Sequence, residues 1–394
     1  MNVPKLRFKE FNDDWIEEKI NELVELNPKN PNLPENFIYI DLESVSNGIL
    51  LQEKILTKDD APSRAQRQVK VNDILYQTVR PYQKNNLFID KLSHLPYIAS
   101  TGYAILREKN IYQKFLFNKL HTDSFVNEVL DNCTGTSYPA INSNDLGNIK
   151  IFCPNNFKEQ KRIGDFLSLI DKKIELQTKK IEDLKLFKKG LINKVINELT
   201  FYKKIELSEL GVTYTGLTGK TKEDFENGES RYIPFVDILN NKINIDILPL
   251  VNIKKNEIQN KVRKYDLFFN TSSETANEVG LCTTLNFDIE NTYLNSFCFG
   301  YRINDVNKIN NEYLNILLHS NIYRKKISIL GQGFTRVNIS KNKLMKIKVL
   351  IPSYKKQLEI VDVINIENNK ILLEESKLYK LQKLKKGLMQ NMFV

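Results

Sequence analysis

The chain of 394 residues carries one long segment twice. Lys188-Lys189-Gly190-Leu191 recurs as Lys385-Lys386-Gly387-Leu388, and the two glycines are 197 positions apart (387 − 190). Gln160 and Gln357 stand at the same offset. A repeat of this length far exceeds the roughly 20–50 residues of solenoid and propeller repeats. The sequence therefore predicts two copies of one module, which can be arranged about a pseudo-two-fold axis.

Composition narrows the class of protein and of partner. Hydrophobic residues make up 41% of the chain, which is near the globular norm and allows buried cores. The net charge of +10 and the isoelectric point near 9.1 favour a polyanionic partner. The four cysteines lie far apart, so metal-ligand and disulfide interpretations are both weak. No apolar run suits a signal core or a membrane span, so we expect a cytoplasmic protein without a membrane partner.

Two proline-free segments, starting near Lys158 and Ser353, show apolar residues in a heptad pattern. A 3.5-residue period is typical of a coiled-coil seam, and each helix would be roughly 60 Å long at about 1.5 Å per residue. Asn156 and Ser353 stand at the expected helix starts, where such side chains cap free backbone N–H groups. The residues predicted to form the helix seam or to dock other subunits are Ile163, Leu167, Ile174, Gln177, Ile181, Leu184, Gly190, Leu191, Ile364, Ile371, Glu374, Leu378, Leu381, Gly387 and Leu388.

This pattern leaves two helix arrangements open. The segments can be separate amphipathic helices on two globular cores, or an antiparallel pair packed on each other. The pair is favoured because polar residues interrupt both stripes at matching places, such as Gln177 and Glu374. A glycine inside a helix costs about 1 kcal/mol relative to alanine. Gly190 and Gly387 therefore indicate a close helix approach or a subunit contact, or they were simply copied by the duplication.

A block with short β-strand patterns and many turn signals precedes each helix. The predicted division is a first domain over residues 1–155, a spacer helix over 156–200, a second domain over 201–352 and a second spacer helix over 353–394. Asp73–Tyr76 aligns with Asp266–Phe269, and Gly135–Leu146 aligns with Gly333–Leu344. The blocks diverge between these anchors, as expected of two domains that recognise different things on one fold. The predicted fold class is α+β, with two similar mixed α/β domains.

Motifs for catalysis are missing from the sequence. There is no phosphate loop, no dinucleotide-binding glycine motif, no methyl-donor motif and no nuclease carboxylate trio. Three histidines, His94, His121 and His319, are scattered along the chain. We therefore predict no catalytic, cofactor-binding or metal-binding residues. Two other classes stay open: a self-contained DNA methyltransferase or nuclease, and a structural coiled-coil adaptor that binds proteins only.

The order of variable block, long helix, variable block and long helix resembles the specificity subunit of type I restriction-modification systems. The most specific stretches are the block ends, Ser137–Ile141 with Glu159–Ile163 and, in the second copy, Thr335–Ser340. Asp73–Tyr76 followed by Thr78–Tyr82 looks like one class of target-recognition domain in that family, and Ser272–Thr275 in the second copy looks like another. The second copy departs from the first at two of these positions. Lys356 stands where the first copy has Glu159, and Asn368 stands where it has Asp171.

The resemblance implies a non-catalytic reader of double-stranded DNA. The two blocks would be target-recognition domains, each reading one half of a bipartite, asymmetric target. The helices would form an antiparallel coiled coil that sets the spacing and docks two methyltransferase (M) subunits, with restriction (R) subunits joining in the full complex. S-adenosylmethionine, ATP and Mg²⁺ would belong to those partners, so the chain itself is expected to hold no cofactor.

Side chains that read DNA are abundant in both blocks. Base edges are read mainly by Arg, Lys, Asn, Gln and Ser/Thr, and phosphates are bound mainly by Lys and Arg. Each such residue can also be a solvated surface charge, and Ser272 can equally cap a helix. The residues predicted to contact DNA are Arg64, Arg67, Lys70, Arg80, Lys84, Lys220, Lys261, Arg263, Ser272 and Arg336.

Overall fold

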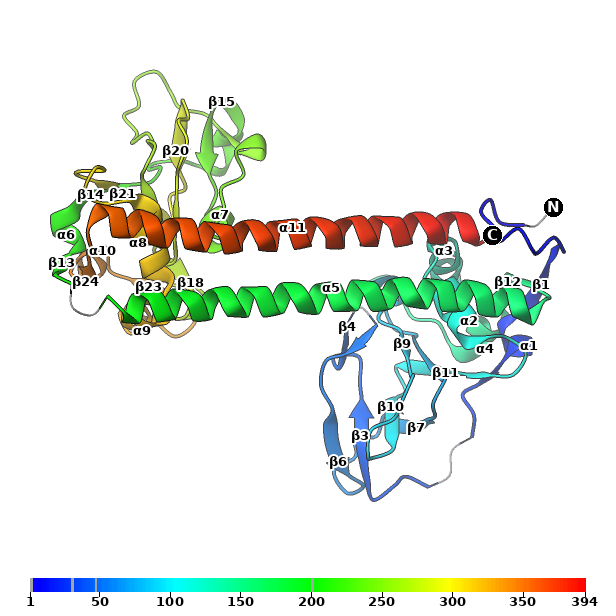
Figure 1. Ribbon diagram of the computed structural model, residues 1–394. Coiled ribbons are helices and arrows are strands. Elements are labelled where there is room, and N and C mark those ends of the chain that lie inside the picture. The colour runs from blue at the N-terminus through cyan, green and yellow to red at the C-terminus, as the bar shows by residue number, and fades with distance from the viewer. Residues whose placement is uncertain (1–2, 30–31, 47, 200–201) are drawn as a thin grey trace. The chain divides into compact units, whose positions relative to one another are not determined.

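The computed structural model describes residues 3–29, 32–46, 48–199 and 202–394 (Figure 1). The chain divides into two compact units, each drawing on two parts of the sequence. The first unit is Met1–Thr178 with Ser376–Val394, and the second is Lys179–Glu375. The predicted domain boundaries at residues 1, 200 and 201 lie outside the described residues. Each unit combines one globular block with one half of each long helix.

The two long helices have nearly the predicted bounds. Helix α5 spans Phe157–Asn197 and helix α11 spans Tyr354–Met392. The predicted capping residues act at both starts: the Asn156 side chain accepts a hydrogen bond from the Lys158 backbone N–H at 3.0 Å, and the Ser353 hydroxyl accepts one from Lys356 at 3.4 Å.

In the first unit, two four-stranded sheets have the orders β6-β3-β10-β7 and β2-β11-β8-β9, while β1 pairs with β12. Strand β10 runs parallel to β3, and the other pairs in these sheets are antiparallel. The elements before α5 are β1 (Trp15–Lys19), α1 (Ile20–Leu23), β2 (Val24–Leu26), β3 (Asn36–Ile40), β4 (Val45–Ser46), β5 (Ile49–Leu50), β6 (Lys54–Thr57), β7 (Ala65–Val69), β8 (Ile74–Gln77), η1 (Pro81–Gln83), β9 (Leu87–Phe88), β10 (Tyr97–Ser100), β11 (Tyr103–Glu108), α2 (Gln113–Lys119), α3 (Asp123–Asp131), α4 (Ser143–Asn148) and β12 (Lys150–Pro154).

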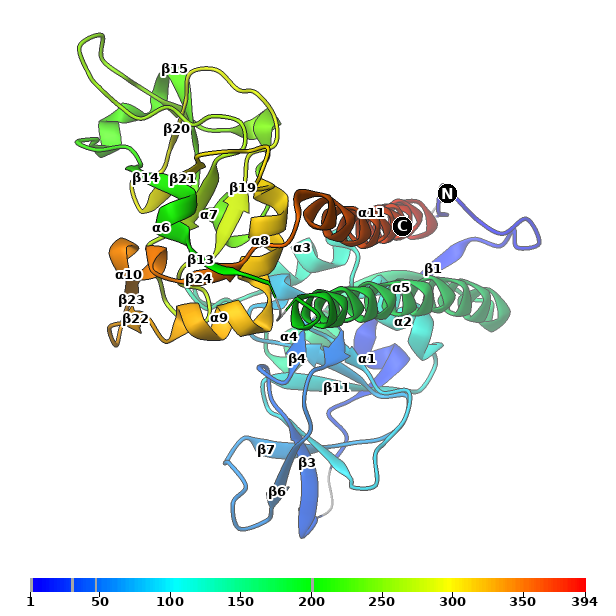
Figure 2. The same cartoon turned by 60° about the vertical axis from the view of Figure 1, so that its left-hand side comes forward.

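The second unit repeats this plan with different strand lengths and with three strands instead of four in one sheet. Its main sheets have the orders β14-β21-β17-β19 and β16-β15-β20, in which β15 and β20 are the parallel pair. Figure 2 shows α8 beside β19 and α11. The elements before α11 are β13 (Lys204–Glu206), α6 (Leu207–Leu210), β14 (Gly211–Thr215), η2 (Lys222–Asp224), β15 (Phe225–Ile233), α7 (Phe235–Leu239), η3 (Ile245–Ile247), β16 (Leu250–Val251), β17 (Leu267–Asn270), β18 (Ser272–Ser273), β19 (Cys282–Thr284), β20 (Thr292–Leu294), β21 (Cys298–Ile303), α8 (Asn311–His319), α9 (Asn321–Ser328), β22 (Gly331–Gln332), β23 (Val337–Ile339), α10 (Lys341–Met345) and β24 (Lys348–Leu350).

The duplication is visible in buried polar contacts. Asp73, just before β8, accepts hydrogen bonds from the Arg107 guanidinium at 2.9 and 2.7 Å. Asp266, just before β17, accepts the same pair of bonds from Arg302 at the same distances. Since a bidentate guanidinium–carboxylate pair fixes both groups in one plane, each copy ties the start of its central strand to the neighbouring strand in the same way. The predicted alignment of these aspartates is confirmed.

A second shared contact joins each long helix to its block. The Gln160 side chain accepts from the Tyr112 backbone N–H and donates to the Pro154 carbonyl, both at 2.8 Å. Gln357 makes the equivalent bonds to Asn310 at 2.8 Å and to Pro352 at 3.0 Å. These glutamines satisfy backbone groups that the surrounding block buries, which explains why both copies retain them.

The first unit also needs a glycine where α5 meets α2. A Cβ added to Gly164 would lie 2.7 Å from the backbone nitrogen of Phe115 and 2.9 Å from the carbonyl carbon of Lys114. Real Cβ atoms do not approach backbone atoms so closely, so only glycine allows this packing. Ile163 and Leu167, on either side, are buried in the same core.

Within each unit the two helix halves lie side by side with cross-helix bonds. Asp171 binds Lys385 in the first unit, with 2.5 Å between Oδ1 and Nζ. In the second unit, Lys180 binds Glu374 at 3.1 Å, and Lys188 binds Asn368 farther along, at 3.0 Å. Because the residue number rises on α5 while it falls on α11, the pair is antiparallel there. The separate-helix alternative is therefore wrong.

Most apolar positions of the predicted seam are buried or half-buried, including Ile181, Ile364 and Ile371. Of the two predicted glycines, Gly190 is exposed and Gly387 is half-buried. Among the described residues, a Cβ added to either would meet no atom within 4 Å, so neither glycine marks a close helix approach. The alternative interpretation, a contact with another subunit at these glycines, stays a prediction. The predicted pairing of Gln177 with Glu374 joins residues of different units and stays a prediction.

Candidate DNA interface

In the first unit, an arginine and an aromatic ring meet where β8 ends. Arg80 follows β8 with φ of 53°, a left-handed conformation that is uncommon for a residue other than glycine. Its backbone N–H donates to the Pro139 carbonyl at 2.7 Å. Its guanidinium carbon lies 4.1 Å from the centroid of the Tyr138 ring, within cation–π range. The unusual backbone and the stacking together hold Arg80 in one place, as is typical of functional sites.

The second unit has the equivalent corner after β17. The Thr78 and Thr271 backbone N–H groups donate to Gly102 at 3.0 Å and to Phe297 at 3.1 Å, respectively. The bridge between Val79 and Ala140 corresponds to the pairing of Ser272 with Asn338. We call these regions the first corner (residues 78–82, 100–102 and 134–141) and the second corner (residues 271–275, 295–298 and 331–338).

The second corner also places an arginine over an aromatic ring, from different positions. The Arg336 guanidinium carbon lies 5.3 Å from the centroid of the Phe297 ring. Phe334, at the tip of the β22–β23 turn, is fully exposed, and Gly333 beside it has φ of 122°. In the first corner the exposed aromatic residues are Tyr82 and Tyr138. Exposed aromatic rings beside an arginine, which is half-buried at Arg80 and exposed at Arg336, are typical of interaction surfaces.

The aromatic members were not recognised as site residues in the sequence. Tyr138 and Phe334 fall in the segments that align between the copies, but no periodicity distinguishes an exposed ring from a buried one. Phe297 is aligned with Gly102 only through the shared threonine bonds. A count of aromatic residues near turn signals would have been the available clue.

Two other predicted contacts lie beside the first corner. The Arg64 carbonyl accepts a hydrogen bond from Thr101 at 3.0 Å, next to Gly102. Arg67 lies in β7 opposite Ala99 and is half-buried. Its Nε has no hydrogen-bond partner among the described residues, and burial lowers the pKa of its guanidinium. Buried donors normally have a partner, and contact of Arg67 with DNA stays a prediction.

Three predicted contacts lie at the opposite ends of the central strands. The backbone N–H groups of Lys70 and Arg263 donate to Asp73 at 2.7 Å and Asp266 at 2.8 Å, before β8 and β17 begin. Lys261 is close to Arg263, and its ammonium donates to the Asn291 side chain at 3.0 Å. These three side chains are exposed, but the corners lie beyond the other end of each strand. The predicted residues are therefore spread over two regions of each block.

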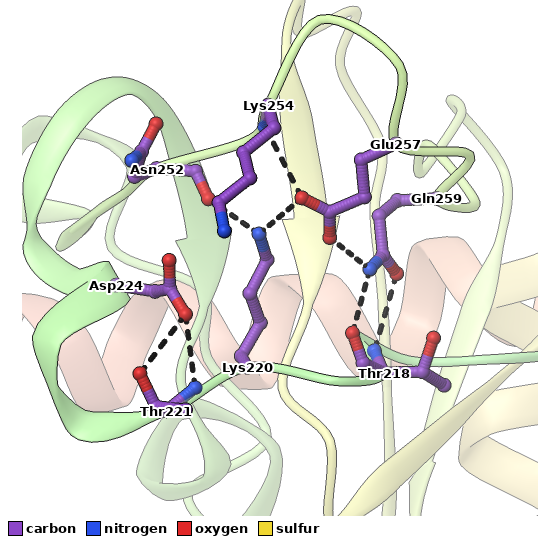
Figure 3. Close-up of polar contacts among 8 residues, drawn as sticks. All are labelled: Thr218, Lys220, Thr221, Asp224, Asn252, Lys254, Glu257 and Gln259. Atoms are coloured by element: carbon purple, nitrogen blue, oxygen red, sulfur yellow. Dashed lines mark hydrogen bonds and ion pairs between the residues drawn. The ribbon is translucent and has the colours of Figure 1, made fainter.

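Lys220 is not a surface residue, and its assignment to DNA needs correction (Figure 3). Its side chain is only 3% exposed, and its ammonium lies 2.5 Å from both the Glu257 carboxylate and the Asn252 carbonyl. The Lys220 hydrogen bond, followed by one from Gln259, lowers the pKa of Glu257 to about 2. Gln259 in turn bonds both backbone groups of Thr218. The lysine therefore closes a loop inside the domain, and its donors are used there.

Lys84 and Ser272 are also engaged within the fold. The Lys84 ammonium binds the Asp123 carboxylate at 2.7 Å and the His121 carbonyl at 3.0 Å. Ser272 is buried in β18, where it pairs with Asn338 in β23. A buried strand residue neither caps a helix nor presents its hydroxyl to a groove, so both sequence interpretations of Ser272 were wrong.

The described ranges contain neither a metal-binding cluster nor a membrane-spanning helix. No group of three or more His, Cys, Asp or Glu side chains among these residues could hold a metal ion. In the same part of the chain, no helix combines the length and the apolar character needed to cross a membrane. The four cysteines are free thiols.

Comparison with known proteins identifies the family of the chain. The sequence profile of the type I restriction modification DNA specificity domain matches residues 12–186 and again 201–383. The HindI specificity subunit of Haemophilus influenzae is 29% identical over 149 residues, which cover 36% of this chain and 32% of that protein. The MjaVIII specificity subunit of Methanocaldococcus jannaschii is 28% identical over 195 residues, covering 47% and 46% of the two chains. The matches thus span less than half the length of these curated relatives.

A solved structure shares the fold over the whole length. The S subunit of a type I restriction-modification system from M. genitalium superposes with a TM-score of 0.58 and 17% identity. The superposition covers all of this chain and 99% of that one. The predicted architecture of two related blocks and two long helices is therefore confirmed.

Proposed function

The chain belongs to the type I restriction-modification DNA specificity family, and we propose that its two blocks each read one half of a bipartite, asymmetric DNA target. The observation that carries this proposal is the pair of corners. Both have the same backbone frame, built from the Thr78 and Thr271 hydrogen bonds. The side chains on that frame differ, with Tyr138 in one copy and Arg336 in the other. A common frame with different contacting groups suits two unlike half-sites.

The chemistry of the corners fits base reading. An arginine can donate two hydrogen bonds to a guanine edge in the major groove, and one such pair contributes about 1–3 kcal/mol of discrimination. The ring beneath Arg80 or Arg336 restricts the guanidinium before DNA arrives, which lowers the entropy lost on binding. Lys70, Lys261 and Arg263, at the far strand ends, are proposed to bind phosphates. Such contacts set position and salt dependence but carry no sequence information.

We further propose that the helices dock two methyltransferase subunits, with restriction subunits joining that assembly. The support is a second, exposed apolar stripe that the repeat duplicates. Leu169 and Leu176 of α5 are exposed in the first unit, and Ile366 and Leu373 of α11, at the same offset of 197 (366 − 169), are exposed in the second. Exposed large apolar side chains at heptad spacing suit a partner helix. Two equivalent stripes provide for two partners.

In this proposal the chain is a non-catalytic, cytoplasmic subunit. Methyl transfer from S-adenosylmethionine and ATP- and Mg²⁺-dependent cleavage belong to the partner subunits. The purified chain is expected to transfer no methyl group, and detectable transfer by the chain alone would favour the enzyme alternative. DNA binding by the assembled complex is expected to weaken steeply with salt. Absence of salt-dependent DNA binding by the complex would instead favour a structural adaptor that binds proteins only.

The decisive experiment exchanges one block. The second block, residues 202–352, is replaced by that of a related specificity subunit, and the methylome of a host carrying the cognate methyltransferase is sequenced. One half-site should change while the other half-site and the spacer length stay the same. Exchange of the first block is the matched control and should change the other half. A change of both halves, or of neither, would reject independent reading.

The proposed spacing role of the helices has its own test. Seven residues inserted into α5 should keep the seam in phase and change the distance between half-sites, while each half stays readable. Two inserted residues should rotate the seam by roughly 200°, at about 100° per residue, and prevent assembly. An active heptad variant with an unchanged spacer would show that the helices do not set the spacing.

A further inference from the structure

The second unit contains a polar pocket that DNA reading does not use. Its volume is about 420 Å³, within the usual range for small-ligand sites. It is bounded by α5, α8, α11, β19 and the segment after α7, and Figure 2 shows α8 between β19 and α11. All its lining residues belong to the second unit.

The pocket carries an excess of positive charge. Lys188, Lys189 and Lys242 line it, against the single carboxylate of Glu312. That carboxylate already accepts hydrogen bonds from the side-chain amides of two asparagines, one of them Asn365 at 3.1 Å. Among the described residues, neither Lys189 nor Lys242 has an ion-pair partner. Three lysines against one carboxylate leave two uncompensated positive charges.

His319 also lines the pocket but adds no charge at neutral pH. Burial lowers the pKa of its imidazole to about 4. Glu375, a further carboxylate close enough to act on Lys188, is paired with Lys185 at 2.7 Å. The positive excess therefore remains when the neighbouring titratable groups are counted.

Lys188 and its counterpart in the first copy have different partners. Its counterpart, Lys385, forms an ion pair with Asp171 at 2.5 Å. Lys188 instead donates to the amide oxygen of Asn368 at 3.0 Å, and Asn368 is the counterpart of that aspartate (368 − 171 = 197). Burial lowers the pKa of Lys188. The second copy thus has an amide where the first has a neutralising carboxylate, beside a half-buried ammonium whose uncompensated charge is costly.

We propose that this pocket binds a phosphate group, with Lys188, Lys189 and Lys242 supplying the positive charge. A phosphate presents at least three acceptor oxygens and more than one negative charge at neutral pH, which matches three lysines and an excess of two charges. Asn368 keeps Lys188 in position without neutralising it. The phosphate can come from a free phosphate ester or from the DNA backbone. The inference is independent of how the corners read DNA.

The test restores the charge balance of the first copy. The full-length chain is titrated with pyrophosphate at low salt by calorimetry. The wild-type chain should bind, while Asn368→Asp and Lys188→Gln should bind about tenfold more weakly or worse, because each removes one net positive charge from the pocket. Lys385→Gln is the matched control and should bind like wild type. Absence of wild-type binding, or wild-type affinity in both Asn368→Asp and Lys188→Gln, would overturn the proposal.

A second arm identifies the source of the phosphate. DNA affinity is measured with the chain assembled with its methyltransferase subunits, with and without pyrophosphate. If the phosphate belongs to DNA, Asn368→Asp should lower the affinity and pyrophosphate should compete. If it belongs to a free ester, DNA affinity should stay unchanged in both comparisons. If pyrophosphate binds the wild-type chain and is weakened in the two variants, either DNA result is consistent with the phosphate site and identifies the source of the phosphate. Thermal melting of both variants checks that they remain folded.

Discussion

Replacing Asp266 by asparagine is expected to loosen the second unit around β17. The Asp266 carboxylate is 1% exposed and accepts four hydrogen bonds. Two come from the Arg302 guanidinium at 2.9 and 2.7 Å, one from the Tyr214 hydroxyl at 2.6 Å and one from the Arg263 backbone at 2.8 Å. Asparagine offers only one acceptor oxygen. Its NH2 group is a donor and would face the donors that now bind the Asp266 carboxylate. The substitution also leaves the guanidinium without a counter-charge.

The size of the effect follows from burial. Removing one partner of a buried ion pair costs about 3–5 kcal/mol. Arg302 is 29% exposed, so water can solvate part of its charge. Its guanidinium also stays 4.9 Å from the centroid of the Tyr214 ring, which retains some stabilisation. We therefore expect the lower end of the range, about 3 kcal/mol, which corresponds to a change in the opening equilibrium of more than about a hundredfold.

Hydrogen exchange measured by mass spectrometry can resolve this change within the full chain. Peptides covering β17 and β21 should exchange faster in Asp266→Asn, while peptides of the first unit should not change. Asp73→Asn should give the mirror result in β8 and β11. Asp288→Asn removes an exposed ion pair to Lys264 and should change stability by less than about 0.5 kcal/mol. If Asp266→Asn exchanged no faster than Asp288→Asn, the buried pair would not hold this strand.

Three further expectations follow from packing, protonation and exposure. Gly164→Ala should destabilise the chain by about 1–3 kcal/mol because the added Cβ would meet backbone atoms. Gly190→Ala, where the Cβ would meet no atom, should stabilise it by roughly 0.5–1 kcal/mol because alanine favours the helix. Equal urea midpoints of the two variants would contradict this. Burial lowers the pKa of His121 from 6.5 to about 4, so the unfolded chain binds a proton that the folded chain excludes, and stability should fall as the pH drops through that window. His121→Gln should make that pH dependence shallower in urea titrations, with the rest left to His319, whose pKa is lowered in the same way; an unchanged slope would refute the assignment. In the assembled complex, Phe334→Ala should weaken DNA binding without changing its salt dependence, whereas Arg336→Gln should reduce the salt slope by about one if the arginine binds phosphate; unchanged affinity in both would remove the second corner from the interface.

The long helices could be predicted because their signal is local. Heptad spacing, the absence of proline and a capping side chain are all contained within one segment, so the expected start near Lys158 differs from the observed Phe157 by one residue. The antiparallel pairing followed from matching polar interruptions. What the pattern could not show is which residues face open space. Gly190 and Gly387 stand beside seam residues, yet nothing packs on them within the described chain.

The corners could not be predicted because they are assembled from distant segments. Arg80 meets Tyr138 only after β8 and the turn before α4 have been brought together by the bridge from Val79 to Ala140. The predicted DNA contact of Lys220 was wrong for the same reason. In the sequence it is one lysine in a polar stretch, and its acceptors at Asn252 and Glu257 come 32 and 37 residues later. In the sequence an exposed lysine looks the same as a buried, ion-paired one. The two are distinguished only by partners that lie far away in the chain.

The two copies differ most where a change costs the fold least. Asp73 and Asp266 are both buried with an arginine, and losing either would leave an unpaired buried charge. Asp171 is 40% exposed in its own ion pair, so its replacement by the amide of Asn368 leaves Lys188 bonded and the helix seam intact. The same reasoning applies to the corners, where the backbone bonds recur and the exposed side chains do not. Functional differences between the blocks are therefore to be sought at partly exposed positions on the shared hydrogen-bonded frame, and the pocket beside Lys188 is one such place.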